Sequence, residues 1–401
     1  MRILMVSQSY FPFQAAGGPP TKIRAIAKRL VAHGHKVSVV TADMGFGKSN
    51  GPPEPPTQDR WGWRLEEGGV EAVYLRTRGR YRALTINPGL KNYCDESLRS
   101  FDVIHIYGLY DLLGIAVASK CKQLQIPYVV EPIGMYLPIV RSLWLKRAYH
   151  LLAGKRLMRE ASRVIATSEQ EKLELISGGI AESKIVIRRN GVEVPDRLPL
   201  PGAFRKKLGI AANAKLVLFL GRLIAKKSPD LLIRAYSKWR KAAGSGKTSM
   251  LVLGGPNEQD GYLRNLESLV RELGLKESVS FPGPLYDDDK WQAYRDADVF
   301  VLPSQNENFG NTIAEAIACG TPVIVTDRCG IGPAIAGRAG LMVPHDAIEI
   351  ENALAKMLAE ESPRERYLGG CEEVARELSW NQPLAQMESL YSQLVSETSG
   401  R

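Results

Sequence analysis

Two glutamates with a seven-residue spacer, Glu307 and Glu315, are the first candidates for chemistry. A helix that begins near Asn311 would present unpaired backbone N–H groups and a positive dipole end, which suit an anion such as a phosphate. Glu315 would lie about one turn inside that helix and Glu307 in the loop before it, so both could face one ligand. The spacing alone equally suits a helix whose acidic side chains only complement its dipole.

Two cations, Arg222 and Lys227, follow the apolar run 216–220 and precede a helical pattern over residues 229–241. A fork-shaped guanidinium and an ammonium on one strand-to-helix loop suit a diphosphate, through two donors on one side and a point charge on the other. A solvated basic turn is the alternative interpretation. The loop therefore predicts an anion site next to the two glutamates only if the fold brings the two segments together.

The surrounding pattern predicts the elements that would position these residues. Buried strands alternate with helices along both halves of the chain, which indicates an α/β fold with two doubly wound sheets and ligands at the carboxyl ends of the strands. The segment between residues 45 and 69 is rich in Gly and Pro, and we expect a loop there. The predicted strands are 2–6, 37–41, 103–107, 126–131, 164–168, 216–220, 250–253, 279–283, 299–303, 321–326 and 340–344, and the strand at 164–168 would close the first sheet. The predicted helices are 21–33, 169–175, 229–241, 262–273, 311–318, 348–358 and 383–395.

Composition narrows the protein class. A chain of 401 residues, of which 44% are apolar, is long enough for two packed cores. No run approaches the ~18 apolar residues of a membrane span, and the apolar segment at the N-terminus is too short for a signal peptide. We therefore expect a cytoplasmic protein. The five cysteines show no paired spacing, which favours small buried side chains over disulfides or a structural metal.

The positive charge belongs to the first half of the chain. Residues 1–200 hold 29 Lys and Arg against 18 Asp and Glu, whereas the remainder holds 24 against 25. This asymmetry predicts an anionic partner for the first half. Residues 141–163 mix Trp and Leu with six or more basic side chains, which is typical of an interfacial membrane helix and equally of an ordinary amphipathic surface helix.

Residues 303–324, PSQNENFGNTIAEAIACGTPVI, resemble the nucleotide-sugar motif of the family 4 (group 1) retaining glycosyltransferases. The resemblance extends over nearly the whole chain and implies the GT-B fold, with two Rossmann-like domains facing a central cleft. It places an acceptor-binding domain at 1–197 and a nucleotide-sugar-binding domain at 198–380. Residues 381–401 would form a closing helix that packs back on the first domain.

The resemblance also implies roles for individual residues. Glu307 would contact the donor sugar, Glu315 would hold the ribose hydroxyls, and Arg222 and Lys227 would clamp the diphosphate; Ser228 stands where relatives usually carry glycine. Relatives carry a histidine or arginine for the donor sugar after the strand that ends at Glu131, and this chain has neither. Further donor-binding candidates are Asn308, Phe309, Gly310, Asn311, Thr312 and the glycine-loop residues Gly17 and Gly18, and weaker candidates are His105, Glu131 and Leu285.

The expected activity is the retaining transfer of a sugar from a nucleotide diphosphate sugar, without a metal ion. The nucleotide sugar is a substrate, so we expect no cofactor. The acceptor would be a glycan or a lipid-linked molecule of cell-surface polysaccharide or lipopolysaccharide synthesis, and the enzyme would lie at an anionic membrane surface. Residues 287–289 are three aspartates that we interpret as the start of a helix rather than as a metal site. A nucleotide-sugar epimerase, a glucan synthase and a non-catalytic nucleotide-sugar binder are alternatives. The lack of interleaved aromatics or a recognisable module argues against nucleic acid.

Overall fold

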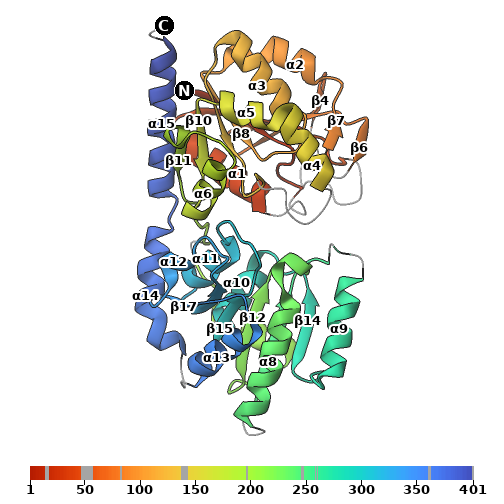
Figure 1. Cartoon of the computed structure of the whole chain (residues 1–401), viewed down its shortest axis with the longest axis vertical. Coiled ribbons are helices and arrows are strands. Elements are labelled where there is room, and N and C mark those ends of the chain that lie inside the picture. The colour runs from red at the N-terminus through yellow and green to blue at the C-terminus, as the bar shows by residue number, and fades with distance from the viewer. Residues whose placement is uncertain are drawn as a thin grey trace. The chain divides into compact units, whose positions relative to one another are not determined.

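A computed structural model describes residues 1–13, 18–46, 57–81, 84–136, 143–195, 197–244, 248–257, 259, 261–359 and 363–399. The chain divides into two compact units, one formed by Met1–Asn190 with Asn381–Arg401 and the other by Gly191–Trp380. Each unit is an α/β fold with its own sheet and core (Figure 1). The C-terminal residues therefore belong to the same unit as the N-terminus.

The first unit is built on a nine-stranded sheet in the order β11-β10-β9-β8-β1-β2-β5-β4-β3. Neighbours from β11 to β5 are parallel, and β4 and β3 extend the sheet by antiparallel pairing. Its strands are β1 Arg2–Ser7, β2 Lys36–Ala42, β3 Thr57–Asp59, β4 Gly62–Glu67, β5 Val70–Leu75, β8 Val103–Tyr107, β9 Tyr128–Glu131, β10 Arg163–Ala166 and β11 Ile185–Ile187. A separate hairpin joins β6 Gly79–Tyr81 and β7 Leu84–Ile86.

Helices cover both faces of this sheet. Alternate residues of β1 and β8, such as Leu4 and Ile104, join a core under α2 Leu90–Ser97, α3 Leu113–Leu124 and α5 Lys155–Glu160. The opposite face carries α1 Gly18–Ala32 and α15 Asn381–Ser399, which contact each other. The remaining helices of the unit are α4 Leu143–Tyr149, a π turn His150–Gly154 and α6 Glu169–Ser177.

The second unit has a six-stranded parallel sheet in the order β14-β13-β12-β15-β16-β17. The chain order reverses between β12 and β15, and ligands bind at such a switch point in doubly wound sheets. Its strands are β12 Lys215–Leu220, β13 Ser249–Gly254, β14 Val279–Gly283, β15 Val299–Leu302, β16 Val323–Thr326 and β17 Gly340–Val343. Every residue of β15 and β16 is buried, as expected for strands covered on both faces.

The helices of the second unit also form two layers. One layer contains α8 Pro229–Ala243, α9 Tyr262–Glu272 and α13 Ala347–Leu358. The other contains α7 Ala203–Leu208, α10 Asp287–Asp296, α11 Asn311–Ala318 and α14 Pro363–Glu377, and a short α12 spans Gly332–Ile335. The expected α/β class with two doubly wound sheets is therefore confirmed.

The expectation of a loop between residues 45 and 69 is wrong for its described part. β3 and β4 lie there and pair with β5, where residue pairs such as Arg64 and Val73 lie opposite each other. The alternation of buried and exposed residues is weak in these edge strands, since Leu65 is buried but Trp63 and Arg64 are only half-buried. Residues 47–56, which hold most of the Gly and Pro, lie outside the described residues.

Candidate active site

Two loops meet at the switch point of the second sheet. The loop after β12 carries Arg222 and Lys227, and the loop after β15 carries Glu307. The amide of Gln305 donates to the carbonyl oxygen of Lys226 at 2.9 Å, and Ser304 Oγ donates to the same oxygen at 3.1 Å. Two loops that are about 80 positions apart in sequence are thus fixed beside each other by hydrogen bonds to one backbone carbonyl.

Lys227 and Glu307 form the ionic centre of this site. Lys227 Nζ donates to Glu307 Oε2, and the two side chains are 15% and 19% exposed. Burial alone would raise the pKa of Glu307, but Lys227, Lys226 and Arg222 together lower the pKa of this carboxyl below its ordinary value. Glu307 therefore stays ionised, and a positive field surrounds it.

The backbone around Glu307 is held on two further sides. Its amide donates to the carbonyl oxygen of Arg328 at 2.9 Å, and its own carbonyl accepts from the amide of Gly330 at 2.8 Å. Gly310 precedes α11 with a φ of 91°, and a Cβ there would lie 2.5 Å from Ile313 Cδ1. The positive φ favours glycine at this turn, from which α11 begins.

Glu315 lies on α11 and is held by two residues of α10. Lys290 Nζ donates to Glu315 Oε1 at 2.9 Å, and the hydroxyl of Tyr294 donates to Oε2 at 2.9 Å. Tyr294 is fully buried, and burial followed by the charge of Glu315 raises the pKa of its hydroxyl well above the ordinary value. Lys290 also lies over the ring of Trp291, with 4.4 Å from Nζ to the ring centroid. The carboxylate of Glu315 is therefore fixed before any ligand arrives.

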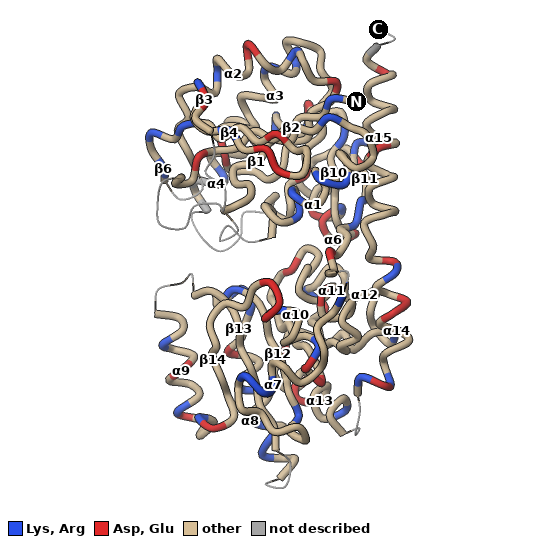
Figure 2. The backbone as a smooth tube through the Cα atoms, turned by 180° about the vertical axis from the view of Figure 1, so that it is seen from behind, with Lys and Arg blue, Asp and Glu red and all other residues tan. Residues whose placement is uncertain are grey.

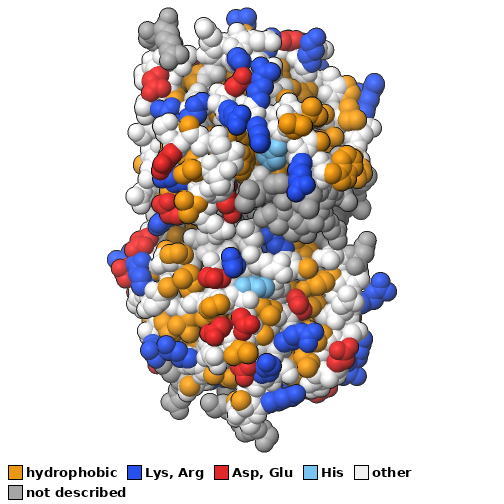
Figure 3. Space-filling view, in the orientation of Figure 1, with side chains coloured by type: hydrophobic (Ala, Val, Ile, Leu, Met, Phe, Trp, Pro, Cys, Tyr) orange, Lys and Arg blue, Asp and Glu red, His pale blue; other side chains and the backbone are white. Residues whose placement is uncertain are grey.

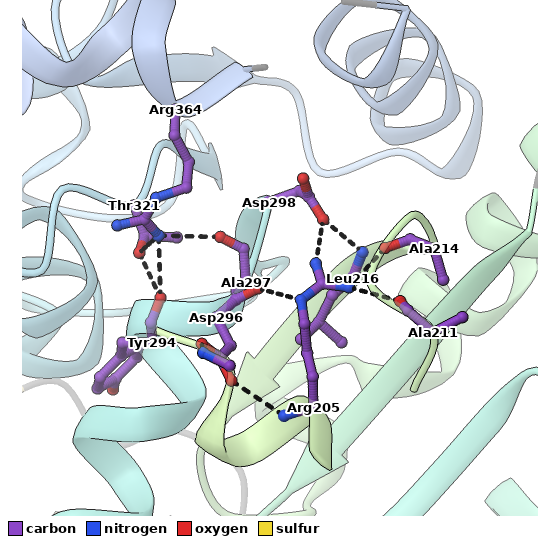
Figure 4. A network of polar contacts seen from close by, with 11 residues as sticks. Arg205, Ala211, Ala214, Leu216, Tyr294, Asp296, Ala297, Asp298, Thr321 and Arg364 are labelled. Carbon is purple, nitrogen blue, oxygen red and sulfur yellow. Dashed lines mark hydrogen bonds and ion pairs between the residues drawn. The ribbon is translucent and has the colours of Figure 1, made fainter. Parts of the chain in front are cut away.

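The C-terminal end of α10 is anchored by two arginines (Figure 4). Arg364 from α14 donates to the carbonyl oxygens of Tyr294 at 3.2 Å and Ala297 at 3.0 Å. Arg205 from α7 donates to the carbonyl oxygen of Asp296 at 3.1 Å and forms an ion pair with Asp298 at 2.8 Å. Because α10 supplies both partners of Glu315, this network fixes α10 and thereby positions the carboxylate of Glu315.

Ser228 occupies the position where the resemblance implies glycine. Its φ is 51°, in the left-handed region that glycine adopts without strain. The side chain is buried, and its hydroxyl contacts His345 Nε2 at 3.0 Å and the carbonyl oxygen of Ala225 at 3.3 Å. These contacts favour serine here, because its hydroxyl makes one hydrogen-bond contact within the same turn and one to His345 after β17.

The other expected donor-binding residues of the second unit lie around the same loop. Phe309 is buried in the core, whereas Asn308, Asn311 and Thr312 are half-buried at the start of α11. Leu285 is half-buried beyond the carboxyl end of β14, where it packs on the core of the unit. The structure places all of them at one edge of the sheet with Glu307.

The candidates of the first unit do not form a comparable site. Gly18 is the exposed first residue of α1, and Gly17 lies outside the described residues. His105 and Glu131 are both fully buried. Glu131 is paired with Lys22 and Arg188, and His105 Nδ1 lies 2.6 Å from the hydroxyl of Tyr391. Their burial favours a structural role in the core over contact with a sugar.

The charges of this buried cluster are set by one another. Burial alone would raise the pKa of Glu131, but Arg188 and Lys22 lower the pKa far below the ordinary value. Burial lowers the pKa of Lys22 to about 8 and that of His105 to about 4. His105 Nε2 lies 3.5 Å from Glu131 Oε2. The carboxylate of Glu131 on β9 thus joins α1, β8 and the residue after β11, and His105 extends the cluster to Tyr391 on α15.

The three aspartates at 287–289 form the first turn of α10, as predicted, and are the red segment at the start of α10 in Figure 2. The N-cap itself is Tyr286. Asp289 pairs with Lys207 at 2.7 Å. In the part of the chain that the structure describes, no group of three or more His, Cys, Asp or Glu side chains could hold a metal ion. The five cysteines are buried, as predicted, and each is a free thiol.

Sequence reasoning missed three residues of this site: Lys290, Tyr294 and His345. Lys290 and Tyr294 are four residues apart on one helix, which is a spacing that places two side chains on the same face. That signal was present, but nothing in the sequence showed that this face meets α11. His345 follows β17 and reaches Ser228 only through the packing of the sheet.

Comparisons with known proteins agree with this geometry. The model of the glycosyl transferases group 1 family matches residues 202–369, and that of the glycosyl transferase 4-like domain matches residues 17–191. The D-inositol 3-phosphate glycosyltransferase of Kineococcus radiotolerans is 32% identical over 241 residues, a stretch that covers 55% of this chain and 54% of the relative. The chain thus spans about half the length of that relative.

Solved structures show the same architecture. Sucrose-phosphate synthase of Thermosynechococcus elongatus superposes with a TM-score of 0.77 and 23% identity over 99% of both chains. Anabaena Alr3699/HepE in complex with UDP-glucose superposes with a TM-score of 0.76 and 19% identity over 98% of this chain and 100% of that one. At these identities the likeness establishes the fold, and the expected GT-B fold is confirmed. With both halves matched by its family models, the chain belongs to the group 1, family 4-like glycosyltransferases.

Proposed function

We propose that this protein is a glycosyltransferase that moves a sugar from a nucleotide diphosphate sugar to a glycan or lipid-linked acceptor. One observation carries the proposal: the switch point of the second sheet brings Lys227 against Glu307 beside the N-terminus of α11. HepE, whose structure contains UDP-glucose, shares the fold. A diphosphate needs fixed positive charge, and a sugar needs a hydrogen-bonding carboxylate; this loop pair offers both.

The two charges that develop during transfer explain the arrangement. Breaking the anomeric bond leaves negative charge on the diphosphate and positive charge on the sugar. Lys227, Arg222 and the α11 amides would stabilise the leaving diphosphate, while the ionised Glu307 would face the sugar. We assign Glu315 to the ribose hydroxyls, since its two oxygens are already oriented by Lys290 and Tyr294.

Retention and metal independence are parts of the same proposal. The cations and amides supply the charge that a divalent metal would otherwise supply to the diphosphate. Delivery of the acceptor to the face from which the leaving group departs would retain the anomeric configuration. The family resemblance and the basic first half favour an acceptor of cell-surface polysaccharide or lipopolysaccharide assembly at the cytoplasmic side of a membrane.

A transfer assay with a panel of nucleotide sugars and lipid-linked acceptors tests this proposal. We expect one donor to be consumed with formation of a glycosylated product, without loss of rate after chelation of divalent metals. The product should keep the anomeric configuration of the donor when examined by NMR. A donor that is isomerised rather than transferred would instead identify an epimerase, and inverted product would contradict retention.

A further inference from the structure

The surface of the first unit carries large apolar side chains that its core does not use. Trp144, Leu151 and Leu152 are 72%, 83% and 80% exposed. They lie on α4 and on the π turn that follows it. Soluble proteins rarely expose large apolar side chains together unless the surface binds something.

The same helical segment is fastened to the unit by its inner face. His150, Gly154, Leu157 and Met158 are buried, and Leu157 and Met158 belong to the core under α3 and α5. A Cβ on Gly154 would lie 2.6 Å from Tyr149 Cε1, so glycine lets the π turn close against that ring. The exposed leucines are therefore held outward by a packed helix rather than by a loose end.

Basic side chains surround the exposed apolar ones. Arg147, Lys155 and Arg156 are all exposed on the same segment. Residues 132–159 contain six Lys and Arg and no Asp or Glu. Figure 3 shows hydrophobic and basic side chains intermixed over the part of the first unit that carries α4 and α5 in Figure 1. We call the set Trp144, Arg147, Leu151, Leu152, Lys155 and Arg156 the apolar-basic patch.

We propose that the apolar-basic patch docks on an anionic lipid bilayer. Tryptophan and leucine between lysines and arginines match a headgroup layer, in which apolar side chains enter the acyl boundary and cations meet lipid phosphates. A second copy of the chain would bring the same positive charges together, which disfavours self-association through this patch. Among the described residues, no helix is long and apolar enough to cross a membrane. The patch therefore gives the protein a surface attachment, which deepens the proposed function by naming the residues that would hold the enzyme at the membrane of its acceptor.

Co-sedimentation of the full chain with vesicles tests the docking without any sugar or acceptor. We expect binding to phosphatidylcholine vesicles that contain phosphatidylglycerol and little binding to phosphatidylcholine alone. Binding should fall at about 1 M salt, where charges are screened beyond about 3 Å. Equal binding to both vesicles, or binding to neither, would overturn the proposal.

Two double variants separate the apolar and the basic contributions. Leu151→Ser with Leu152→Ser should weaken vesicle binding at least about tenfold, since two leucines lose their burial in the bilayer. Arg147→Gln with Lys155→Gln should weaken it by about fivefold for each charge removed. The matched controls are Leu173→Ser on α6, where Leu173 is 65% exposed, and Arg234→Gln with Lys238→Gln on exposed positions of α8. The controls should bind as the wild type does.

Trp144 supplies a direct signal for the same contact. Its fluorescence should shift to shorter wavelength when anionic vesicles are added, and Trp144→Phe should lose that shift. Circular dichroism checks that each variant is folded, which we expect because surface substitutions rarely change stability by more than about 0.5 kcal/mol. If the folded leucine variant binds vesicles as tightly as the wild type does, the proposal is contradicted. A change from dimer to monomer on removing the leucines would also contradict it, because the patch would then bind a second copy of the chain.

Discussion

At the residue scale, the proposed transfer depends on a few side chains that meet at the switch point of the second sheet. Lys227 and Glu307 are paired, and the cations around Glu307 keep this carboxylate, which would face the sugar, ionised. Preorganised charge of this kind acts without reorganisation during the reaction. The site is therefore built in advance rather than assembled by the substrate.

Replacing Lys227 tests this arrangement. Lys227→Ala should lower turnover roughly 10²–10³-fold while the protein stays folded, because one donor to the developing negative charge is lost. The measurement is the rate of transfer at saturating donor, with Lys238→Ala on an exposed position of α8 as the control. Turnover within about twofold of the wild type would remove Lys227 from the mechanism.

Tyr294 gives a subtler prediction. Tyr294→Phe removes the hydroxyl that donates to Glu315 Oε2 at 2.9 Å and leaves the ring in place. A hydrogen bond to a charged group contributes about 1.5–3 kcal/mol, so the KM for the donor should rise about tenfold or more with kcat nearly unchanged. Tyr236→Phe, which removes a buried hydroxyl bonded to Ser249, should leave KM unchanged. A fall in kcat at constant KM would show that Glu315 acts in the chemical step.

The sequence predicted the charged residues of this site better than their supports. Glu307, Glu315, Arg222 and Lys227 were singled out because they match the motifs of the family, whereas their spacing alone also suited a helix start and a solvated turn. The partners of Glu315 were not found, because Lys290 looks like any exposed basic residue in the first turns of a helix. Only the packing of α10 beside α11 makes it a partner, and that depends on tertiary contacts.

At the element scale, the site depends on helices that carry no catalytic residue. α14 contributes Arg364, whose guanidinium reaches four oxygens on α10, on the α11 cap and on Thr321. Arg364→Ala should lower the free energy of unfolding by about 2–4 kcal/mol, since buried carbonyl oxygens lose their donors. Urea denaturation measures this change, and Arg264→Ala on an exposed position of α9 is the control. Equal stability of the two variants would show that the network in Figure 4 is dispensable.

Most helices and strands in which apolar residues recur at regular spacing were predicted, and the elements that were not predicted have physical causes. β8 was placed to the residue because five buried residues stand between turn signals. α14 was missed because Gly369 and Gly370 interrupt its helical pattern. A Cβ at Gly370 would lie 2.0 Å from the carbonyl oxygen of Arg338, so this glycine allows a close helix contact that only the fold shows.

At the scale of the whole molecule, the first unit contains a buried charge cluster that should make its stability depend on pH. The folded pKa of His105 is lowered to about 4 from an ordinary value of 6.5, so the unfolded chain takes up this proton first as the pH falls. Stability is thus greatest above the unfolded pKa and is lost as the pH falls toward the folded pKa. Between about pH 6.5 and 4.5 the loss should approach about 2 kcal/mol.

Comparison of His105→Gln with the wild type tests this assignment. Urea denaturation at about pH 7 and about pH 4.5 should show a smaller loss of stability for His105→Gln than for the wild type, by about 2 kcal/mol. His33→Gln, at a half-exposed histidine beside Glu388, is the control and should keep the wild-type loss. The same loss in His105→Gln and the wild type would place the pH dependence elsewhere.

The difference in charge between the two halves of the chain was visible in the sequence, but the roles of the individual cations were not. The excess of basic residues in residues 1–200 predicted an anionic partner. Two of those cations, Lys22 and Arg188, are instead buried against Glu131 and serve the core. A sequence does not show which cations are buried and which are exposed, whereas the structure does.

The most direct test of the central claim is nucleotide-sugar binding by thermal shift, with wild type beside Glu315→Ala and a surface control, Glu272→Ala. A ligand at 100 times its Kd adds about 2.7 kcal/mol of stability, which gives a clear shift. One nucleotide sugar should stabilise the wild type and the control but not Glu315→Ala. Equal stabilisation of Glu315→Ala, or no response of the wild type to any nucleotide sugar, would contradict that claim.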